Sequence, residues 1–377
     1  MHKAFKYKLH VSRAVGERLA ATLDVCRELY NAALQERRDA YRLAGVSLNY
    51  YNQAQQLPVI KQECPDVAAV HSQILQDTLR RVQKTFDSFL RGIKAGERVG
   101  YPRFRSKNRY DSFTYPQLGW KLSGNKLTLS KIGSCRIYLS RPVEGAIKTV
   151  TVKREADGWY VSFSVECDRC RYIPKTGASV GVDVGIENFA TLSTGENVTN
   201  PQHLRQTERR LKRAQRNISR KKRGGQRWQK AVHLLRKQHA EIKRRRLDFF
   251  HKLTLQLIRE FDNIAVEDLN IKGMVKNHHL AKSIADASWG IFISILECKA
   301  AEAGRRVVRV PAVYTSQDCS ACGARVRKTL ATREHRCLEC GIVLHRDHNA
   351  AININARALR LGMEKVASPC EPRTYSA

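Results

Sequence analysis

Four cysteines constrain this chain more than any other feature of its sequence. They follow the pattern C-x2-C-x14-C-x2-C at Cys319, Cys322, Cys337 and Cys340. Two thiolate pairs at this separation fit one tetrahedral Zn²⁺ ion, against the alternatives of a disulfide pair or unrelated buried thiols. The second pair ends seven residues before Asp347. The spacing therefore predicts a zinc ribbon that leads directly into a candidate carboxylate ligand.

A large excess of positive charge limits the partners that this chain can have. The 377 residues include 68 lysines and arginines against 35 acidic residues, a formal net charge of +33. Four zinc-bound thiolates would lower that total by only about two, because the ion carries two positive charges. Basic runs are often only solvated surface, but an excess of this size predicts a polyanionic partner, and nucleic acid is the expected one. With 42% hydrophobic residues, the chain is long enough for two or three domains.

The sequence also predicts the compartment. No stretch approaches the roughly eighteen uncharged apolar residues that span a bilayer, and residues 1–6 lack the apolar core of a secretory signal. Eleven cysteines, an odd number, favour a reducing environment. We therefore expect a cytoplasmic protein with no membrane partner. The separate pair Cys167 and Cys170 is interpreted as buried or incidental rather than as a second metal site or a redox motif.

Helical spacing dominates the first hundred residues, and strand spacing follows it. Two helical stretches are separated by breaks at 49–56 and Pro65, and a later sheet pattern extends to Glu166 with a hairpin turn at 156–158. The predicted helices are 13–43 and 67–93, and the predicted strands are 5–9, 126–130, 136–139, 148–152 and 159–165. We interpret the strands as a small antiparallel β-barrel closed by the N-terminal strand, with a linker at 168–176.

The C-terminal half predicts a partly parallel sheet. Residues 178–185 are a nearly continuous apolar run that contains Asp183, and residues 263–269 repeat this buried-strand pattern with Glu267. Alternating β and α segments predict an α/β domain. The other predicted elements are a partner strand at 189–192, a helix at 284–303, a strand at 306–310, a helix from about Asn349 and a disordered tail from 364.

A basic segment interrupts this domain. Residues 205–246 carry eighteen lysines and arginines against Glu208 and Glu241, with a break at Gly224–Gly225. Apolar residues are sparse until Leu247, so we expect a protruding helical hairpin whose second helix continues into the core. Candidate nucleic-acid contacts in this segment are Arg220, Lys221 and Lys222.

Three acids are candidates for a catalytic metal centre: Asp183, Glu267 and Asp347. In an RNase H-like sheet the first and fourth strands are neighbours, so we expect these carboxylates to converge. They would surround two Mg²⁺ ions about 4 Å apart and support phosphodiester cleavage. The alternative is that each acid is an ordinary residue at the end of a strand or helix. An unpaired carboxylate inside an apolar strand is unfavourable by several kcal/mol, which favours metal ligands.

Aromatic and basic side chains alternate in a short segment after the second predicted helix. Aromatic rings can stack on unpaired bases while cations bind phosphate, although plain structural packing is the alternative. The candidate contacts are Tyr101, Arg103, Phe104, Arg105 and Lys107. We interpret Trp289 as a core residue and Asp286 as a helix cap rather than a catalytic auxiliary.

Taken together, these motifs resemble the TnpB family of transposon-encoded proteins, which are relatives of type V CRISPR effectors. The resemblance covers nearly the whole chain. It rests on residues 100–105, 181–185, 266–269, 283–290, 315–317 and 346–353. His345 departs from it, because many relatives carry an acid two residues before the third catalytic aspartate, and the contacts at this point stay open.

The resemblance implies a multidomain α+β protein with an oligonucleotide-binding-like wedge barrel and a helical recognition insertion. A RuvC nuclease domain, interrupted by the zinc ribbon, would follow. It would hold two catalytic Mg²⁺ ions on Asp183, Glu267 and Asp347, and the ribbon would hold one structural Zn²⁺. The implied boundaries are 1–12 and 95–172 for the wedge, 13–94 for the helical domain, 177–314 and 343–363 for RuvC with its basic hairpin at 203–260, 315–342 for the ribbon, and 364–377 for the tail.

The resemblance also implies an RNA-guided endonuclease that cuts double-stranded DNA in the prokaryotic cytoplasm, near the nucleoid. A guide RNA from the transposon end would bind a protein monomer and pair with target DNA beside a short flanking motif. Two other functions stay open, a nuclease-inactive RNA-guided repressor and a strand-transfer transposase. The intact acids disfavour the repressor. They fit hydrolysis and strand transfer equally, so dependence on RNA is the property that separates these enzymes.

Overall fold

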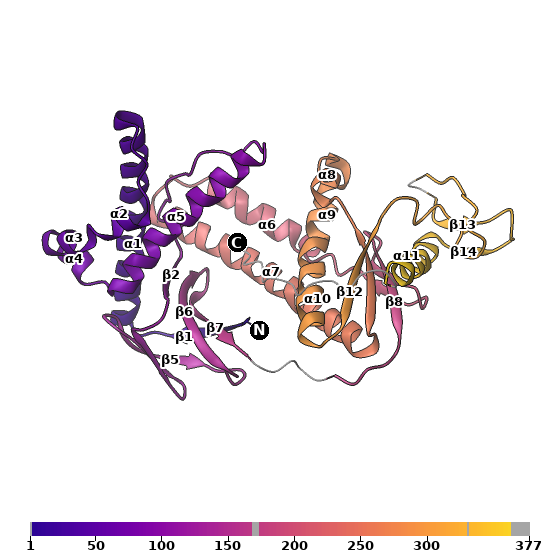
Figure 1. Ribbon diagram of the computed structural model, residues 1–377, viewed down its shortest axis with the longest axis horizontal. Helices are drawn as coiled ribbons and strands as arrows, with labels where there is room; N and C mark the ends of the chain where they lie inside the picture. The colour runs from indigo at the N-terminus through magenta and orange to yellow at the C-terminus, as the bar shows by residue number, and fades with distance from the viewer. Residues whose placement is uncertain (1, 168–172, 330–331, 363–377) are drawn as a thin grey trace. The chain divides into compact units, whose positions relative to one another are not determined.

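The computed structural model describes residues 2–167, 173–329 and 332–362, and the chain divides into two compact units, 1–169 and 170–377 (Figure 1). The predicted linker spans this division, and its first part, the predicted tail and Cys170 lie outside the described residues. Among the described residues, no helix combines the length and the apolar character that a membrane crossing requires.

The first unit is built on one seven-stranded sheet with the order β2-β6-β7-β1-β5-β4-β3, in which all neighbours are antiparallel. The N-terminal strand lies in its middle and joins β7 to β5, while β2 and β3 form the two edges. The five predicted strands are confirmed, two more were not predicted, and closure into a barrel stays a prediction. The strands are β1 (His2–His10), β2 (Ser112–Tyr115), β3 (Trp120–Ser123), β4 (Lys126–Leu129), β5 (Gly133–Tyr138), β6 (Ala146–Glu155) and β7 (Gly158–Glu166).

Two long helices pack with this sheet around an apolar core that includes Leu19, Leu23, Leu75, Phe113 and Phe163. The first predicted helix is confirmed. The second was wrong at its start, because an extended residue at His71 separates a short helix from the long one. The predicted break at 49–56 instead contains a short helix, which Asn49 begins with a capping box. The helices are α1 (Arg13–Ala44), α2 (Tyr50–Ala54), α3 (Leu57–Glu63), α4 (Pro65–Ala68) and α5 (Ser72–Lys94).

The second unit contains a five-stranded sheet with the order β10-β9-β8-β11-β12. The strands β8, β11 and β12 are parallel, whereas β9 and β10 are antiparallel additions. The predicted neighbourhood of the first and fourth strands is therefore confirmed. The strands are β8 (Ser179–Val184), β9 (Asn188–Leu192), β10 (Asn197–Thr199), β11 (Asn263–Asp268) and β12 (Arg306–Pro311).

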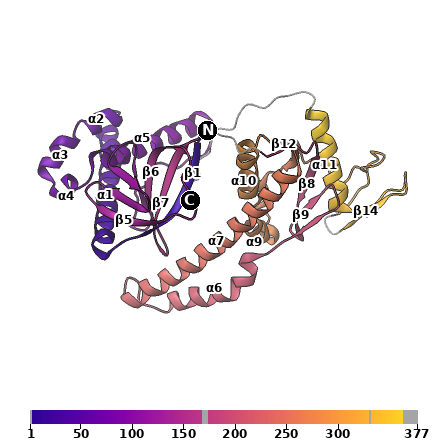
Figure 2. The same cartoon turned by 90° about the horizontal axis from the view of Figure 1, so that it is seen from below.

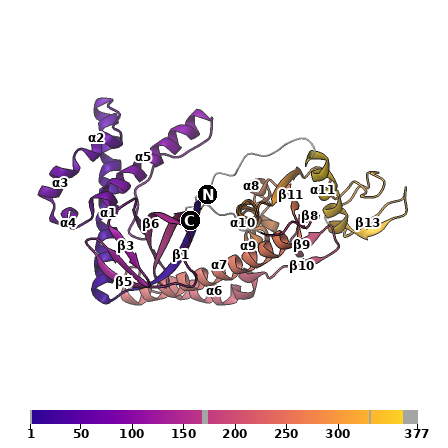
Figure 3. The ribbon, with the colours of Figure 1, turned by 60° about the horizontal axis from the view of Figure 1, so that its bottom comes forward.

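Helices cover both faces of this sheet. Apolar residues of α7 (Gln226–Glu260) and α10 (Trp289–Glu302) pack on one face in a single core, and α11 (Arg346–Gly362) packs on the other (Figure 3). The predicted basic hairpin consists of α6 (His203–Ser219) and α7, and Figure 2 shows it extending from the sheet. The two shorter helices of this unit are α8 (Ile271–Met274) and α9 (His278–Ala287).

The prediction of one continuous helix at 284–303 was wrong. The stretch 284–303 forms the end of α9 and then α10, because Ser288 between them adopts a left-handed conformation with φ 52°. A left-handed residue cannot continue a right-handed helix. Trp289, the first residue of α10, is buried in the core as predicted.

Candidate metal centres and nucleic-acid contacts

Two candidate acids occupy equivalent positions on neighbouring parallel strands. The last registered pair between β8 and β11 is Val182 with Val266, and the next residue on each strand is Asp183 or Glu267. Because side chains alternate along a strand, both acids point away from the apolar face that packs on α7 and α10. They share the opposite face of the sheet with Gly181 and Ala265.

The helix α11 covers this opposite face and carries the third acid. Ala265 packs against Ile354 and Ala358 of α11. A Cβ atom on Gly181 would lie only 2.0 Å from the backbone oxygen of Ala351, so only glycine permits this close approach. The first turn of α11 thereby brings Asp347 to the acids of β8 and β11.

The predicted start of this helix near Asn349 was wrong, since α11 begins at Arg346. His345, where the resemblance left the contacts open, explains the earlier start. Its Nδ1 atom accepts a hydrogen bond of 3.3 Å from the backbone N–H of Asp347. His345 therefore caps the helix that positions the third acid.

Glu267 and Asp347 are buried and Asp183 is half-buried, and the charges of the three acids act on one another. Burial, followed by the charges of Glu267 and Asp347, raises the pKa of Asp183 well above its usual value, although Arg346 acts in the opposite direction. Burial also raises the pKa of Glu267, which is 9% exposed and accepts a hydrogen bond from the Thr315 hydroxyl. Asp347 is 7% exposed and accepts a hydrogen bond of 3.1 Å from Arg346 Nε.

These carboxylates fit hard divalent cations. Buried carboxylate oxygens that repel one another need a positive partner, and oxygen is the ligand that Mg²⁺ prefers. Arg346 supplies only part of the required charge. The roles of Asp183, Glu267 and Asp347 as magnesium ligands stay a prediction, but the structure brings all three together as the sequence reasoning expected.

The four cysteines of the predicted ribbon converge on one point. The Sγ atoms of Cys319 and Cys340 lie 3.7 Å apart, and those of Cys322 and Cys337 lie 3.5 Å apart. All four sulfur atoms lie within 4.8 Å of one another. In the described part of the chain, they are the one group of three or more Cys, His, Asp or Glu ligand atoms gathered this tightly. A tetrahedron with Zn–S bonds of about 2.3 Å has sulfur–sulfur edges of about 3.8 Å, so the donor set fits Zn²⁺.

The pKa of one of these thiols, that of Cys319, is lowered. Burial disfavours the thiolate of Cys319, but the backbone N–H groups of Cys322 and Ala321 and the side chain of His335 outweigh burial and lower its pKa to about 6. His335 is fully buried. A thiolate stabilised in this way is a good metal ligand at neutral pH.

The ribbon is continuous with the helix that carries Asp347. Its hairpin pairs β13 (Glu334–Arg336) with β14 (Val343–His345), and α11 begins at the next residue. The predicted ribbon boundary at 342 lies between these two strands and stays a prediction.

The candidate contacts at 101–107 all lie in the first unit, and they are only partly free. Tyr101 packs edge-on against Phe86 and Phe89 of α5, yet 43% of it is exposed. Phe104 is 47% exposed beneath the guanidinium of Arg38. The segment thus has a structural attachment as well as a surface on which bases could stack.

Arg105 and Lys107 of this segment are held by residues of α1. Asn31 of α1 exchanges two hydrogen bonds, of 2.8 and 3.0 Å, with the backbone of Arg105. Lys107 pairs with Asp24 at 2.9 Å, and Arg103 is exposed. The sequence did not indicate Asn31, because its partner is far along the chain.

The second set of candidate contacts lies in the second unit. Arg220 is the C-cap of α6, and Lys221 and Lys222 follow in the turn to α7. Arg220 and Lys222 are exposed. Asp286 was correctly interpreted as a cap, but it caps a different helix. Its carboxylate accepts hydrogen bonds from the backbone N–H groups of Leu204 and Arg205 at the start of α6 and from Arg246 of α7.

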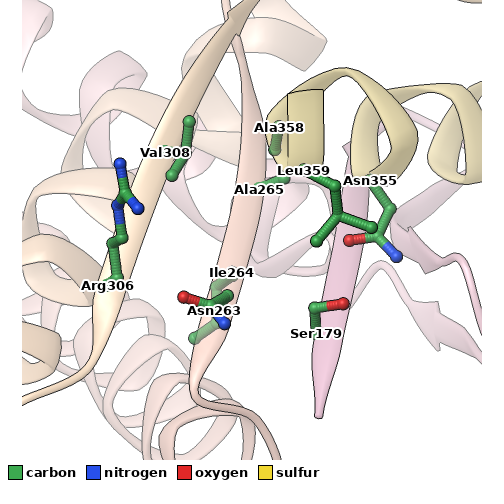
Figure 4. A pocket seen from close by; sticks show the side chains of 9 residues that line it. All are labelled: Ser179, Asn263, Ile264, Ala265, Arg306, Val308, Asn355, Ala358 and Leu359. Carbon is green, nitrogen blue, oxygen red and sulfur yellow. The ribbon is translucent and has the colours of Figure 1, made fainter. Parts of the chain in front are cut away.

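A cavity separate from both candidate metal centres lies at the end of the second sheet where β8, β11 and β12 begin. It measures about 240 Å³ and opens between α11 and the first residues of β8, β11 and β12 (Figure 4). Its lining includes Ser179, Asn263, Arg306 and Asn355. None of the three candidate acids contributes to this cavity.

Comparison with known proteins identifies the family of this chain. A family model described as "Probable transposase" matches residues 162–278, and one described as "Cas12f1-like, TNB domain" matches 289–354. A protein of Streptomyces pristinaespiralis named "Putative RNA-guided DNA endonuclease" is 38% identical over 95% of this chain and 89% of its own length. The chain belongs to the TnpB family. A relative in Escherichia coli K12 with the same description and the name InsQ is 29% identical over 94% of this chain and 92% of its own.

Solved structures place the TnpB fold beside those of two CRISPR proteins. Cas12f1, solved with sgRNA and target DNA, aligns with a TM-score of 0.57 and 14% identity over 91% of this chain and 83% of its own. Cas_phi3, described as a mini RNA-guided endonuclease, aligns with a TM-score of 0.57 and 9% identity over 99% and 94%. A third family model, described as a helix-turn-helix domain, matches residues 1–45, where this TnpB chain forms β1 and the single long helix α1.

Proposed function

We propose that this chain is an RNA-guided endonuclease that cuts double-stranded DNA at one RuvC-type site. The observation that carries the proposal is the meeting of Asp183, Glu267 and Asp347 on one face of the second sheet. The family supports it, because relatives over nearly the full length are named as RNA-guided DNA endonucleases.

The three acids would bind two Mg²⁺ ions, which supply Lewis acidity and a water nucleophile for an in-line attack on phosphate. The three acids are not gathered as tightly as the cysteines, which suits ligands that surround a pair of ions. Thr315 would orient Glu267 through its hydroxyl, and His345 would fix the first turn of α11 beneath Asp347.

The basic surfaces would bind the nucleic acids. The exposed cations Arg103, Arg220 and Lys222 would contact phosphates, and the half-exposed rings of Tyr101 and Phe104 would stack on bases. Guide and target would provide sequence recognition by base pairing, as in related RNA-guided systems. The first unit would be the wedge with its helical insertion, and the protein would act as a monomer on its RNA, in the prokaryotic cytoplasm beside the nucleoid.

Purified protein with its copurified RNA provides the test. A plasmid that matches the 3′ segment of that RNA should be cut in the presence of Mg²⁺, and ribonuclease treatment should abolish cutting. Unaltered cutting after ribonuclease would disprove RNA guidance. Joined DNA products in place of cut ones would identify a strand-transfer transposase, and guided binding by the wild type without cutting would identify a repressor.

A neighbouring acid offers a matched control for the catalytic assignment. Asp183→Asn should abolish cutting while the RNA still copurifies. Asp268→Asn should leave cutting intact, because Asp268 lies beyond the acid pair and its exposed side chain bonds to Arg309 at 3.3 Å. Cutting by the Asp183 variant would show that the assignment is wrong.

A further inference from the structure

A polar face of α11 contacts the segment that joins the two candidate metal centres. Three residues spaced by four, Asn349, Asn353 and Arg357, lie on this face, which differs from the face that packs on the sheet through Ala351, Ile354 and Ala358. Asn349 is fully buried. We call these three residues the polar ladder.

Each member of the polar ladder bonds to residues 311–320, the segment that leads from β12 to the first cysteine pair. Arg357 donates to the backbone oxygens of Pro311 and Val313, at 3.1 and 2.6 Å. Asn353 donates to those of Thr315 and Asp318, at 2.9 and 2.7 Å.

The last member of the polar ladder reaches the zinc knuckle itself. Asn349 donates to the backbone oxygen of Asp318 at 2.8 Å and accepts from the N–H of Ser320 at 2.9 Å, on both sides of Cys319. A buried amide that is satisfied at both ends holds its partners in one arrangement. A shift of Cys319 would therefore disturb α11.

The segment 311–320 also contacts Glu267, one of the three candidate acids. The hydroxyl of Thr315 bonds to Glu267, and the backbone oxygen of Thr315 accepts from Asn353. Asp347 stands on the first turn of α11, ahead of Asn349. The segment 311–320 thus connects Cys319, Glu267 and the helix of Asp347 through direct hydrogen bonds.

We propose that the polar ladder couples the two metal centres, so that filling the cysteine site with zinc tightens divalent-cation binding at the three acids. The proposal rests on the proposed metal ligands of both centres. Asn349, Asn353 and Arg357 act as positioning residues, because they touch neither the metals nor the substrate. Linkage requires the effect to be reciprocal, so a divalent ion at the acids strengthens zinc binding by the same factor.

The affinity of the full-length protein for Mn²⁺ provides the test, measured by the electron paramagnetic resonance of free Mn²⁺. Zinc-loaded wild type should bind Mn²⁺ at least about five-fold more tightly than zinc-depleted wild type, which is the lower range of known coupling factors. Asn353→Ala should retain zinc but bind Mn²⁺ with the same affinity in both forms. A general loss of stability would weaken both affinities without removing their dependence on zinc.

Asn355 supplies the matched control. It lies on the same helix but lines the separate cavity beside β8 (Figure 4). Asn355→Ala should keep the dependence of Mn²⁺ affinity on zinc. Equal Mn²⁺ affinities in the two wild-type forms, or a persisting difference in Asn353→Ala, would overturn the coupling.

A second measurement avoids zinc-depleted protein, which could lose its fold. The zinc affinity of wild type, measured by competition with a chromogenic chelator, should rise when saturating Mg²⁺ is added, and in Asn353→Ala it should not change. An unchanged wild-type zinc affinity would overturn the coupling while the nuclease proposal stands. If wild type binds Mn²⁺ no better than Asp183→Asn, the carboxylate centre fails and the coupling fails with it.

Discussion

The two ends of the second sheet place aspartates in opposite environments. Asp262, directly before β11, accepts hydrogen bonds from the backbone N–H groups of Thr176 and Gly177 and pairs with the buried Arg305. The bond from Thr176, followed by that from Gly177 and the charge of Arg305, lowers the pKa of Asp262 although partial burial opposes the shift. At the other end, burial and two acidic neighbours raise the pKa of Asp183.

This difference separates a structural acid from the proposed metal ligands. The surroundings of Asp262 stabilise its charge and thereby attach the entering chain to the sheet. The surroundings of Asp183 disfavour its charge, which is an unfavourable arrangement unless a cation completes it. The carboxylates therefore destabilise the metal-free fold at one end of the sheet and not at the other. This is expected for a site that a ligand completes.

The largest effect is expected for Asp183→Asn. We expect cleavage to fall by at least about 10³-fold, since loss of one positioned electrostatic group alone costs about 10²–10³. The metal-free variant should nevertheless melt at a higher temperature than metal-free wild type, because one repelling charge is gone. Calorimetry in a chelator, with and without added Mg²⁺, measures this gain. A lower melting temperature would mean that the acids do not repel one another.

Gly181 tests how closely α11 must approach the end of the sheet that carries Asp183 and Glu267. In Gly181→Ala the new Cβ would lie 2.0 Å from the backbone oxygen of Ala351, so the helix must move. Overpacking of this kind costs about 1–3 kcal/mol of stability, and a displacement of Asp347 by about 1 Å could lower the cleavage rate about 10²-fold.

The control is Gly16→Ala in α1, where the nearest atom would be 3.7 Å from the new Cβ. This change should be neutral or stabilise the helix by up to about 1 kcal/mol. Wild-type cleavage by Gly181→Ala would show that α11 does not need its close contact with β8.

The hydroxyl of Thr315 tests the orientation of Glu267. In Thr315→Val the shape is kept but the hydrogen bond to Glu267 is lost. Partners of metal ligands typically contribute about 10–100-fold in metal affinity, so the Mg²⁺ concentration at half-maximal cleavage should rise about 10-fold or more. Thr315→Ser retains the hydroxyl and should behave like wild type. An unchanged Mg²⁺ requirement in the valine variant would exclude an orienting role.

The sequence indicated the candidate acids because the patterns that mark them are local. A carboxylate inside an apolar strand, as at Asp183 and Glu267, is conspicuous, and the cysteine spacing is specific. The parallel neighbourhood of β8 and β11 followed from the fold that these patterns predict. The start of α11 was missed because the capping residue is His345, which is not among the usual N-cap residues.

The contacts that hold the centres in place had no local signal. Asn353 resembles any polar residue on an exposed helix face until its partners, Thr315 and Asp318, are known. In the same way, Asp286 caps α6, which begins 83 residues before it. Such long-range hydrogen bonds depend on how elements meet in space, and hydrophobic periodicity carries no information about them.

Asp262→Asn should have the smallest effect on cleavage. Its effect on stability should be opposite to that of Asp183→Asn. It should lower the melting temperature at neutral pH, because the charge that pairs with buried Arg305 is lost, and cleavage per folded molecule should stay near wild type. The pH dependence of the melting temperature shows which charge state of each aspartate stabilises the fold.

Because the pKa of Asp262 is lowered in the fold, its contribution to stability is present above the unfolded value of about 3.9 and is lost as the pH falls through the lower folded value. The raised pKa of Asp183 destabilises the metal-free protein increasingly as the pH rises from about 3.9 towards the folded value. Melting temperatures of the two variants should therefore lie on opposite sides of wild type at neutral pH and approach it in acid. Shifts in the same direction at pH 7 would show that the two ends of the sheet do not differ in the way their pKa values indicate.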